Sequence, residues 1–183
     1  MPGHDNAIAN LLVITALGQD RPGLVGDLTG AVGDTGCNIL DSRMTTLGCE
    51  FGVMMLVSGR WDELARLEAG LAGVGRRLGL VLQSRRTESP EPTGQTLPYV
   101  AEVVSLDQPG IVSQLAGFFA QREISIRDLS TASYQAQHTG TRMATVQITV
   151  DVPASLHLAT LRDEFMEFCD QLNLDAMIEP LKH

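Results

Sequence analysis

The segment Asp20-Arg-Pro-Gly-Leu-Val25 decides the fold, because it occurs a second time as Asp107-Gln-Pro-Gly-Ile-Val112. The second copy lies 87 residues further along the chain, and this offset holds without a gap for about the next twenty residues. Asp41, for example, matches Asp128. A repeat of this length predicts two domains of the same fold in tandem.

The two copies differ in the length of one hairpin. Phe51–Val57 aligns with Met143–Thr149 only when about five residues are added to the second copy. The additional residues fall around Gln135–Gly140. We therefore expect a longer hairpin loop in the second domain.

The residues around the repeat have the periodicities of short strands and amphipathic helices. After each Asp-x-Pro-Gly, apolar residues fall at i, i+1, i+4, i+7 and i+8, which is one face of a helix. Pro22 and Pro109 are expected in the first turn of these helices, where a missing N–H is tolerated, and Gly36 is expected to end the first of them. Strands are predicted at 11–17, 38–46, 51–58 and 80–82, and again at 99–106, 124–133, 143–150 and 174–178.

A second helix closes each copy. Trp61, Leu64 and Leu67 begin an apolar stripe at helical spacing in the first copy. The corresponding stripe of the second copy is Leu158, Leu161, Phe165, Phe168 and Leu172. The resulting order is βαββαβ twice, which predicts an α+β protein of two ferredoxin-like domains with helices on one face of each antiparallel sheet.

The third strand of each copy indicates which face of the sheet is buried. In the second copy, apolar and polar residues alternate along 143–150. In the first copy, the same alignment puts Val53, Met55 and Val57 on the outer face. An apolar outer face is expected to pack against the sister domain or a second subunit.

A proline-rich stretch separates the copies. Residues 84–98 contain Pro90, Pro92 and Pro98 and almost no apolar side chains, which is typical of a semi-extended linker. We expect domains at 9–86 and 97–181, joined by a linker at 87–96.

Charge and composition exclude several classes of protein. The net charge is −9, with 8 basic and 11 acidic residues in 1–91 and 5 and 11 in 92–183. Neither half is basic, which disfavours direct DNA binding, and Arg76-Arg77 and Arg85-Arg86 are interpreted as solvated surface. No apolar run is long enough to span a membrane, and the N-terminus does not resemble a signal peptide. The sequence predicts a cytoplasmic protein.

No catalytic or metal-binding pattern is present in the sequence. The histidines stand apart at His4, His138, His157 and His183, and the cysteines at Cys37, Cys49 and Cys169 are expected to be free packing thiols. Asp163, Glu164 and Glu167 are interpreted as the solvated face of a helix. No phosphate-binding loop or nucleophile motif occurs. We therefore expect no cofactor, no metal and no enzymatic activity.

The motifs of the first copy resemble the ACT domain. They are Asp-Arg-Pro-Gly-Leu-Val at 20–25 and Gly-Cys-Asn-Ile-Leu-Asp-Ser-Arg at 36–43. ACT domains are βαββαβ modules that bind amino acids or other small ligands, usually between paired modules. With Trp61, the whole pattern is similar to the family of glycine cleavage system transcriptional repressors. The second copy matches less closely, because Ser125 replaces Asn38.

The resemblance implies a ligand site in each copy. Backbone N–H groups at the helix N-terminus attract a carboxylate, and Asp20 and Asp107 are placed to take an ammonium group. Gly23 and Gly110 permit close approach of a ligand, and Asn38 offers a donor and an acceptor from the next strand. The full set of predicted ligand-binding residues is Asp20, Pro22, Gly23, Leu24, Asn38, Ile39, Asp107, Gly110, Ile111, Ser125 and Ile126.

Structural roles compete with these assignments. Asp20 and Asp107 would also suit helix caps, and Asn38 would suit a turn. Asp41 and Arg43 alternate on one strand and are expected to pair across the sheet.

The resemblance implies a regulator that responds to an amino acid, most simply glycine. Such a protein would repress glycine cleavage system transcription by binding a DNA-binding activator protein, without touching DNA itself, and would form a homo-oligomer. A stand-alone ACT regulatory subunit of an amino-acid metabolic enzyme is the alternative. The partner protein recovered with this chain from cells distinguishes the two hypotheses. A DNA-binding partner favours the repressor, and an enzyme favours the regulatory subunit.

Overall fold

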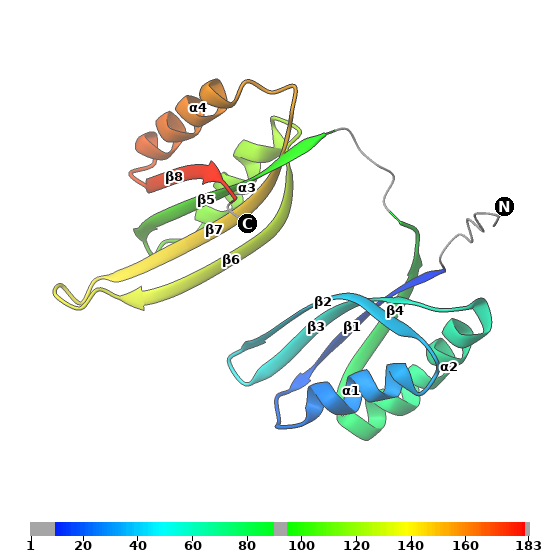
Figure 1. The fold of residues 1–183 in the computed structure, drawn as a ribbon. Helices are drawn as coiled ribbons and strands as arrows, with labels where there is room; N and C mark the ends of the chain where they lie inside the picture. Colours follow the sequence, from blue (N-terminus) through cyan, green and yellow to red (C-terminus); the bar gives the residue numbers. More distant parts are fainter. Residues whose placement is uncertain (1–9, 90–94, 182–183) are drawn as a thin grey trace. The chain divides into compact units, whose positions relative to one another are not determined.

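The chain folds into two compact units, the first within residues 1–91 and the second within 92–183 (Figure 1). The computed structural model describes residues 10–89 and 95–181. The predicted linker at 87–96 includes 90–94, which lie outside the described residues, so the proposed domain bounds stay a prediction. The first unit contains β1 (Leu11–Gln19), α1 (Leu24–Gly33), β2 (Asn38–Leu47), β3 (Glu50–Ser58), α2 (Trp61–Leu78) and β4 (Leu80–Thr87). The second contains β5 (Thr96–Leu106), α3 (Ile111–Ala120), β6 (Ser125–Gln135), β7 (Arg142–Pro153), α4 (Leu158–Gln171) and β8 (Asp175–Pro180).

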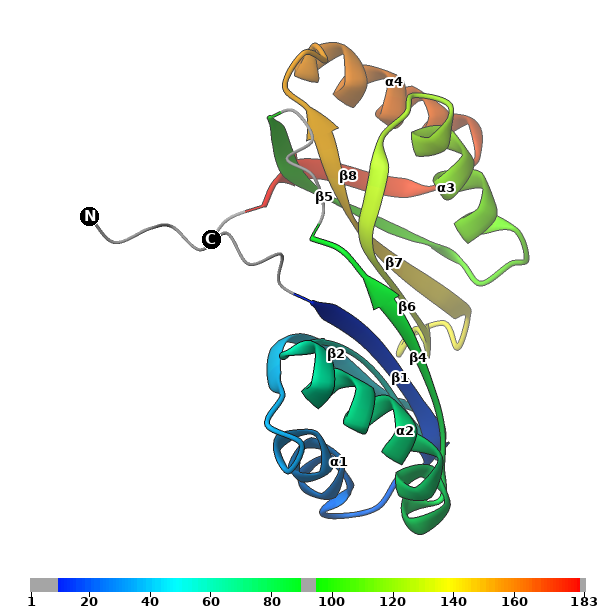
Figure 2. The same cartoon turned by 90° about the vertical axis from the view of Figure 1, so that its right-hand side faces the viewer.

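Each unit is a four-stranded antiparallel sheet with two helices on one face. The strand order is β2-β3-β1-β4 in the first unit and β6-β7-β5-β8 in the second. Figures 1 and 2 show that α1 and α2 share one face of the first sheet, and that α3 and α4 share one face of the second. The predicted tandem ferredoxin-like architecture is confirmed.

Each unit has its own apolar core between helices and sheet. In the first unit, Leu24 and Leu28 of α1 and Leu64 and Leu67 of α2 pack on the inner face of the strands. In the second unit, aromatic residues fill the same space: the rings of Phe118, Phe119 and Phe165 lie within 5.5 Å of one another, centroid to centroid. Such aromatic clusters combine large buried area with favourable ring geometry.

The prediction that Val53, Met55 and Val57 lie on the outer face is wrong. These side chains are 7%, 2% and 0% exposed and belong to the core. Ile39 pairs with Val57 and Ile126 with Val150, so the offset between the copies rises from 87 to 93, and the second hairpin is longer by six residues, not five. A gap set one residue short reverses the face of every side chain that follows in the strand.

The strands extend further into the proline-rich stretch than the sequence predicts. Residues 84–87 complete β4 by pairing with the start of β1. Thr96–Pro98 begins β5 by pairing with the end of β7. Pro98 lies near the start of β5, where a missing N–H is tolerated best. Its carbonyl oxygen accepts a bond from the Leu181 N–H at 3.0 Å.

The helix ends also differ in detail from the prediction. Helix α1 stops at Gly33, and Gly36 follows three residues later with φ of 85°. Trp61 opens α2 but is 70% exposed, so it does not belong to the core stripe. Within the described residues, no helix is long and apolar enough to cross a membrane.

Candidate functional site

The Asp-x-Pro-Gly turns lead from the first strand of each unit into a helix whose N-terminus is open. Gly23 and Gly110 occupy the N-cap positions with φ of 83° and 96°, a left-handed conformation that favours glycine. No side chain caps either helix, so the first N–H groups lack the usual acceptor. Pro22 and Pro109 lie just before these glycines, outside the first helical turn where they were expected.

The aspartates of the two turns are not helix caps. The Asp20 backbone N–H donates to the Cys49 carbonyl at 3.0 Å, and the Thr46 hydroxyl reaches the Asp20 carboxylate at 3.5 Å. The Asp107 N–H donates to the Arg142 carbonyl at 3.0 Å, and its carboxylate lies 3.4 Å from the Arg142 guanidinium. Both carboxylates therefore face the neighbouring hairpin, and the capping interpretation is wrong.

In the second unit, the open helix N-terminus borders a pocket of about 520 Å³. We call it the turn pocket. One side is the turn and the first residues of α3, and the other side is the edge strand β6 with part of β7. Its lining residues are Asp107, Gln108, Gly110, Ile111, Val112, Ser113, Ala116, Thr131, Ser133, Ala144 and Val146. The pocket combines free backbone donors, three hydroxyl groups (Ser113 of α3, Thr131 and Ser133 of β6) and one carboxylate over a small apolar floor.

The predicted site residues fall into two groups at opposite ends of each sheet. Asp20 follows the end of β1, beside the β2–β3 hairpin, whereas Asn38 pairs with Ser58 at the level of Leu11. Eight residues of strand separate these levels, which is about 25 Å at the usual rise per residue. The second unit has the same arrangement. One group lies at the turn: Asp20, Pro22, Gly23 and Leu24 in the first unit, and Asp107, Gly110 and Ile111 in the second. The other group lies at the far end of the sheet: Asn38 and Ile39 in the first unit, and Ser125 and Ile126 in the second.

Two residues of the turn pocket were missed from the sequence. Thr131 and Ser133 of β6 pair with Val146 and Ala144, and like them they face the helix side of the sheet. The signal was available: these hydroxyl residues continue the alternation set by half-buried Leu129, where an apolar residue is expected. Polar residues on the core side of an edge strand mark a place that the helix does not cover.

The equivalent place in the first unit is occupied by larger apolar side chains. Met44 pairs with Val53 and Thr46 with Phe51, which correspond to the pairs Thr131–Val146 and Ser133–Ala144. The ring of Phe51 is buried, with 3% of the residue exposed. Its counterpart in the second unit is Ala144, which has only a methyl group. The two units therefore offer chemically different sites at the same turn.

The remaining sequence interpretations have mixed outcomes. Asp41 and Arg43 form an ion pair along one strand and not across the sheet. Cys37 and Cys169 are buried, but Cys49 is exposed in the β2–β3 turn. His157 precedes α4 with a ring nitrogen 3.1 Å from the Thr160 hydroxyl, and His4 and His183 lie outside the described residues. Within 10–89 and 95–181, no cluster of His, Cys, Asp or Glu could hold a metal ion.

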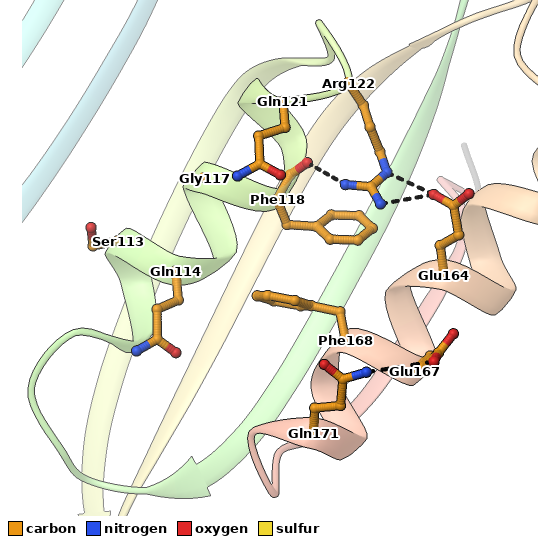
Figure 3. Close-up of a pocket in the computed structure, with 10 residues that line it drawn as sticks. All are labelled: Ser113, Gln114, Gly117, Phe118, Gln121, Arg122, Glu164, Glu167, Phe168 and Gln171. Carbon is orange, nitrogen blue, oxygen red and sulfur yellow. Dashed lines mark hydrogen bonds and ion pairs between the residues drawn. The ribbon is translucent and has the colours of Figure 1, made fainter.

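A second hollow, of about 550 Å³, lies between α3 and α4 (Figure 3). Its floor is formed by the rings of Phe118 and Phe168, whose centroids are 5.0 Å apart. The Arg122 guanidinium stacks 3.7 Å from the Phe118 ring, bonds the Glu164 carboxylate at 2.8 Å and donates to the Phe118 carbonyl. All three of these interactions engage the Arg122 guanidinium. The hollow therefore has fewer free polar groups for a ligand than the turn pocket has.

Comparison with known proteins defines the class first. Residues 10–84 match the model of the ACT domain, and the second unit repeats the topology of the first. The protein is thus built from tandem ACT domains. A protein of Escherichia coli (strain K12) named glycine cleavage system transcriptional repressor is 34% identical over 173 residues, which cover 94% of this chain and 90% of the relative. The chain belongs to the family of glycine cleavage system transcriptional repressors.

One solved structure agrees with this assignment, and a second shares the fold. A structure provisionally described as a glycine cleavage system transcriptional repressor is 31% identical, with a TM-score of 0.74 over 97% of this chain and 100% of that one. A protein of unknown function from Galdieria sulphuraria shares the fold, with a TM-score of 0.76 at 24% identity over 95% and 99%. The Escherichia coli relative and the 31% identical structure, which both match nearly the whole chain, are named as repressors, and this indicates a regulatory role.

Proposed function

We propose that this protein is a cytoplasmic, non-enzymatic regulator that binds a small amino acid, glycine in the first instance, and represses glycine cleavage system transcription. The observation that carries the ligand part is the turn pocket, where open helix N–H groups face two hydroxyls of β6 and a carboxylate. An α-amino acid presents the complementary charges. Its carboxylate would bind the N–H groups of α3, and its ammonium group would bind Asp107.

Repression in this proposal acts through a protein. The net charge of −9 opposes contact with DNA phosphates, because non-specific DNA affinity comes mainly from phosphate neutralisation by basic residues. The partner is then a DNA-binding activator. The ligand changes the affinity for that activator only as far as it prefers one of the two states.

The far-end residues belong to the proposal only between modules. Asn38 and Ser125 lie about 25 Å from the turns of their own units, by strand rise. They would touch the same ligand only from a second ACT module. That module is either the other unit of the same chain or a unit of a second copy, and the proposal includes self-association because it supplies the latter.

Ligand binding is tested by calorimetric titration of the full chain with glycine, alanine and serine. The double variant Thr131→Met/Ala144→Phe gives the second unit the residues of the first, and it should abolish glycine binding. Thr145→Val is the matched control, since this hydroxyl lies on the opposite face of the same sheet. Equal glycine affinity in the double variant would contradict the proposed site, and binding of another amino acid alone would refute glycine as the ligand.

The regulatory part is tested separately in cells. A glycine cleavage promoter reporter is placed in an Escherichia coli strain that lacks its own repressor. The chain should lower expression, and glycine should relieve this effect. In the presence of glycine, the wild type should lose repression and the double variant should keep it. That difference would link the turn pocket to the glycine response. No repression in any condition would contradict the proposed role.

A further inference from the structure

The outer face of the first sheet, opposite the helices, is apolar and exposed. Leu17, Met54 and Val81 are 55%, 54% and 66% exposed, and Val13 and Leu56 beside them are half-buried. The strand register brings these residues together over β3, β1 and β4: Leu56 pairs with Val13, and Leu17 with Val81. We call this surface the outer face. Contiguous apolar surface of this kind marks an interaction site.

The fold does not require this apolar surface. The outer face of the second sheet has the same register but different residues: Gln147, Thr149 and Asp175 stand where the first unit has Met54, Leu56 and Val81. Gln147 there donates to Glu102 at 2.9 Å, which is the arrangement of a solvated surface. At these three positions the outer face of the second unit is therefore more polar than that of the first.

Charges at the two edges of the outer face define how a partner would sit. One row across the sheet reads Asp41, Leu56, Val13, Arg85, with an acid at one edge and a base at the other. Asp41 is exposed and also pairs with Arg43 of its own strand, so a contact with a second copy would be shared with that pair. Arg85 forms no ion pair within the described residues. A two-fold axis parallel to the strands would bring Asp41 of one copy over Arg85 of another. Stacked sheets lie about 10 Å apart, which an aspartate and an extended arginine can bridge together.

The same two-fold axis would place a projecting side chain of each copy in a depression of the other. A depression of about 880 Å³ lies over β1 and β4 and is lined by Val13, Thr15, Gln83 and Arg85 among others. Met54 projects from β3 in the row of Thr15. The two-fold places Met54 of each copy over Thr15 of the other, within that depression.

We propose that the outer face of the first unit is a homodimer interface, covered by the same face of a second copy about a two-fold axis parallel to the strands. The interface is self-complementary in shape, through Met54 and the depression, and in charge, through Asp41 and Arg85. Isologous contacts of this kind close into a dimer.

The first experiment is sedimentation velocity of the full chain over a concentration series. The chain should dimerise, and Met54→Glu should raise the dissociation constant at least about 30-fold, as expected of a central apolar contact. Met177→Glu is the matched control, because it places the same charge on the outer face of the second unit, where Met177 is 46% exposed. It should leave the dimer intact. A monomer at every concentration, or a Met54→Glu dimer as tight as the wild type, would overturn the proposal.

Charge exchange tests the axis. Asp41→Arg and Arg85→Asp should each weaken the homodimer, because like charges then face each other. An equimolar mixture of the two variants should dimerise again, because both contacts between unlike variants join opposite charges. Failure of the mixture to recover, with both variants folded by circular dichroism, would exclude the two-fold arrangement even if the surface is shared.

Discussion

Glu123 and Gly36 occupy the same backbone position after the first helix of each unit, and both are left-handed, with φ of 57° and 85°. This conformation costs a residue with a Cβ about 1–2 kcal/mol. Glu123→Gly should therefore raise the free energy of unfolding by about 1 kcal/mol, after the greater chain entropy of glycine is taken into account. Urea denaturation measures the change.

The mirror-image substitution is the control. Gly36→Ala should destabilise the first unit, because it combines the same strain with a Cβ 3.1 Å from the Glu63 carboxylate. Equal stability of Glu123→Gly and wild type would mean that the Glu123 side chain offsets its own strain.

The three cysteines should differ sharply in reactivity. Burial, and the adjacent Asp170 charge to a smaller extent, raise the pKa of the Cys169 thiol to about 11. At pH 8 this thiol is protonated in the folded protein, and the thiolate is the nucleophile. Brief iodoacetamide treatment should thus label exposed Cys49 and leave Cys37 and Cys169 unmodified until the chain is unfolded. Peptide mass mapping checks this, and rapid labelling of Cys169 in the native state would contradict the burial.

At this scale the sequence located the turns but not the role of each residue. Asp20 and Asp107 stand where a capping aspartate would stand, yet a left-handed glycine takes the N-cap in each unit. The direction of each carboxylate depends on the hairpin beside it, Thr46 in one case and Arg142 in the other. Contacts between residues distant in sequence cannot be read from the local motif.

Helix α1 contains interior glycines that its packing does not require. A Cβ at Gly26, Gly30 or Gly33 would meet nothing within 4 Å. Glycine in a helix interior costs about 1 kcal/mol relative to alanine. Gly30→Ala should therefore stabilise the first unit by about 1 kcal/mol, measured by thermal unfolding.

A glycine that does have a packing reason provides the contrast. A Cβ at Gly75 in α2 would lie 2.7 Å from the Leu80 carbonyl oxygen. Gly75→Ala should lower the unfolding temperature although it also improves helix propensity. If both substitutions raise the unfolding temperature, helix propensity and not packing governs these positions.

The elements themselves were predictable because their periodicities are strong. The failures arose where two elements join: the unequal hairpins shifted the assignment of β3 by one residue, and the prolines concealed the ends of β4 and β5. The hydroxyls of Thr131 and Ser133 were overlooked for a related reason. The alternation along β6 places them on the core side of the sheet, but only the packing of α3 shows that the helix leaves this part of the edge strand uncovered.

At the scale of the whole chain, the duplication gives two separate cores, one built from residues within 12–82 and the other within 99–178. Phe165 is fully buried among the aromatic rings of the second core. Phe165→Ala should cost the second unit about 3–5 kcal/mol. Calorimetry should then show one transition moved to lower temperature and one unchanged.

Leu64→Ala supplies the reciprocal control, because Leu64 is equally buried in the first core. It should displace the other transition. If each substitution shifts the entire heat absorption together, the two units unfold as one cooperative body.

The division of the chain into two units has an optical consequence through Trp61. It is the only tryptophan, and it belongs to the first unit, whereas both tyrosines, Tyr99 and Tyr134, belong to the second. The natural chain therefore carries its energy-transfer donors in one unit and its acceptor in the other. Tyrosine-sensitised tryptophan emission would follow the separation of the units when a ligand is added, without any label or substitution.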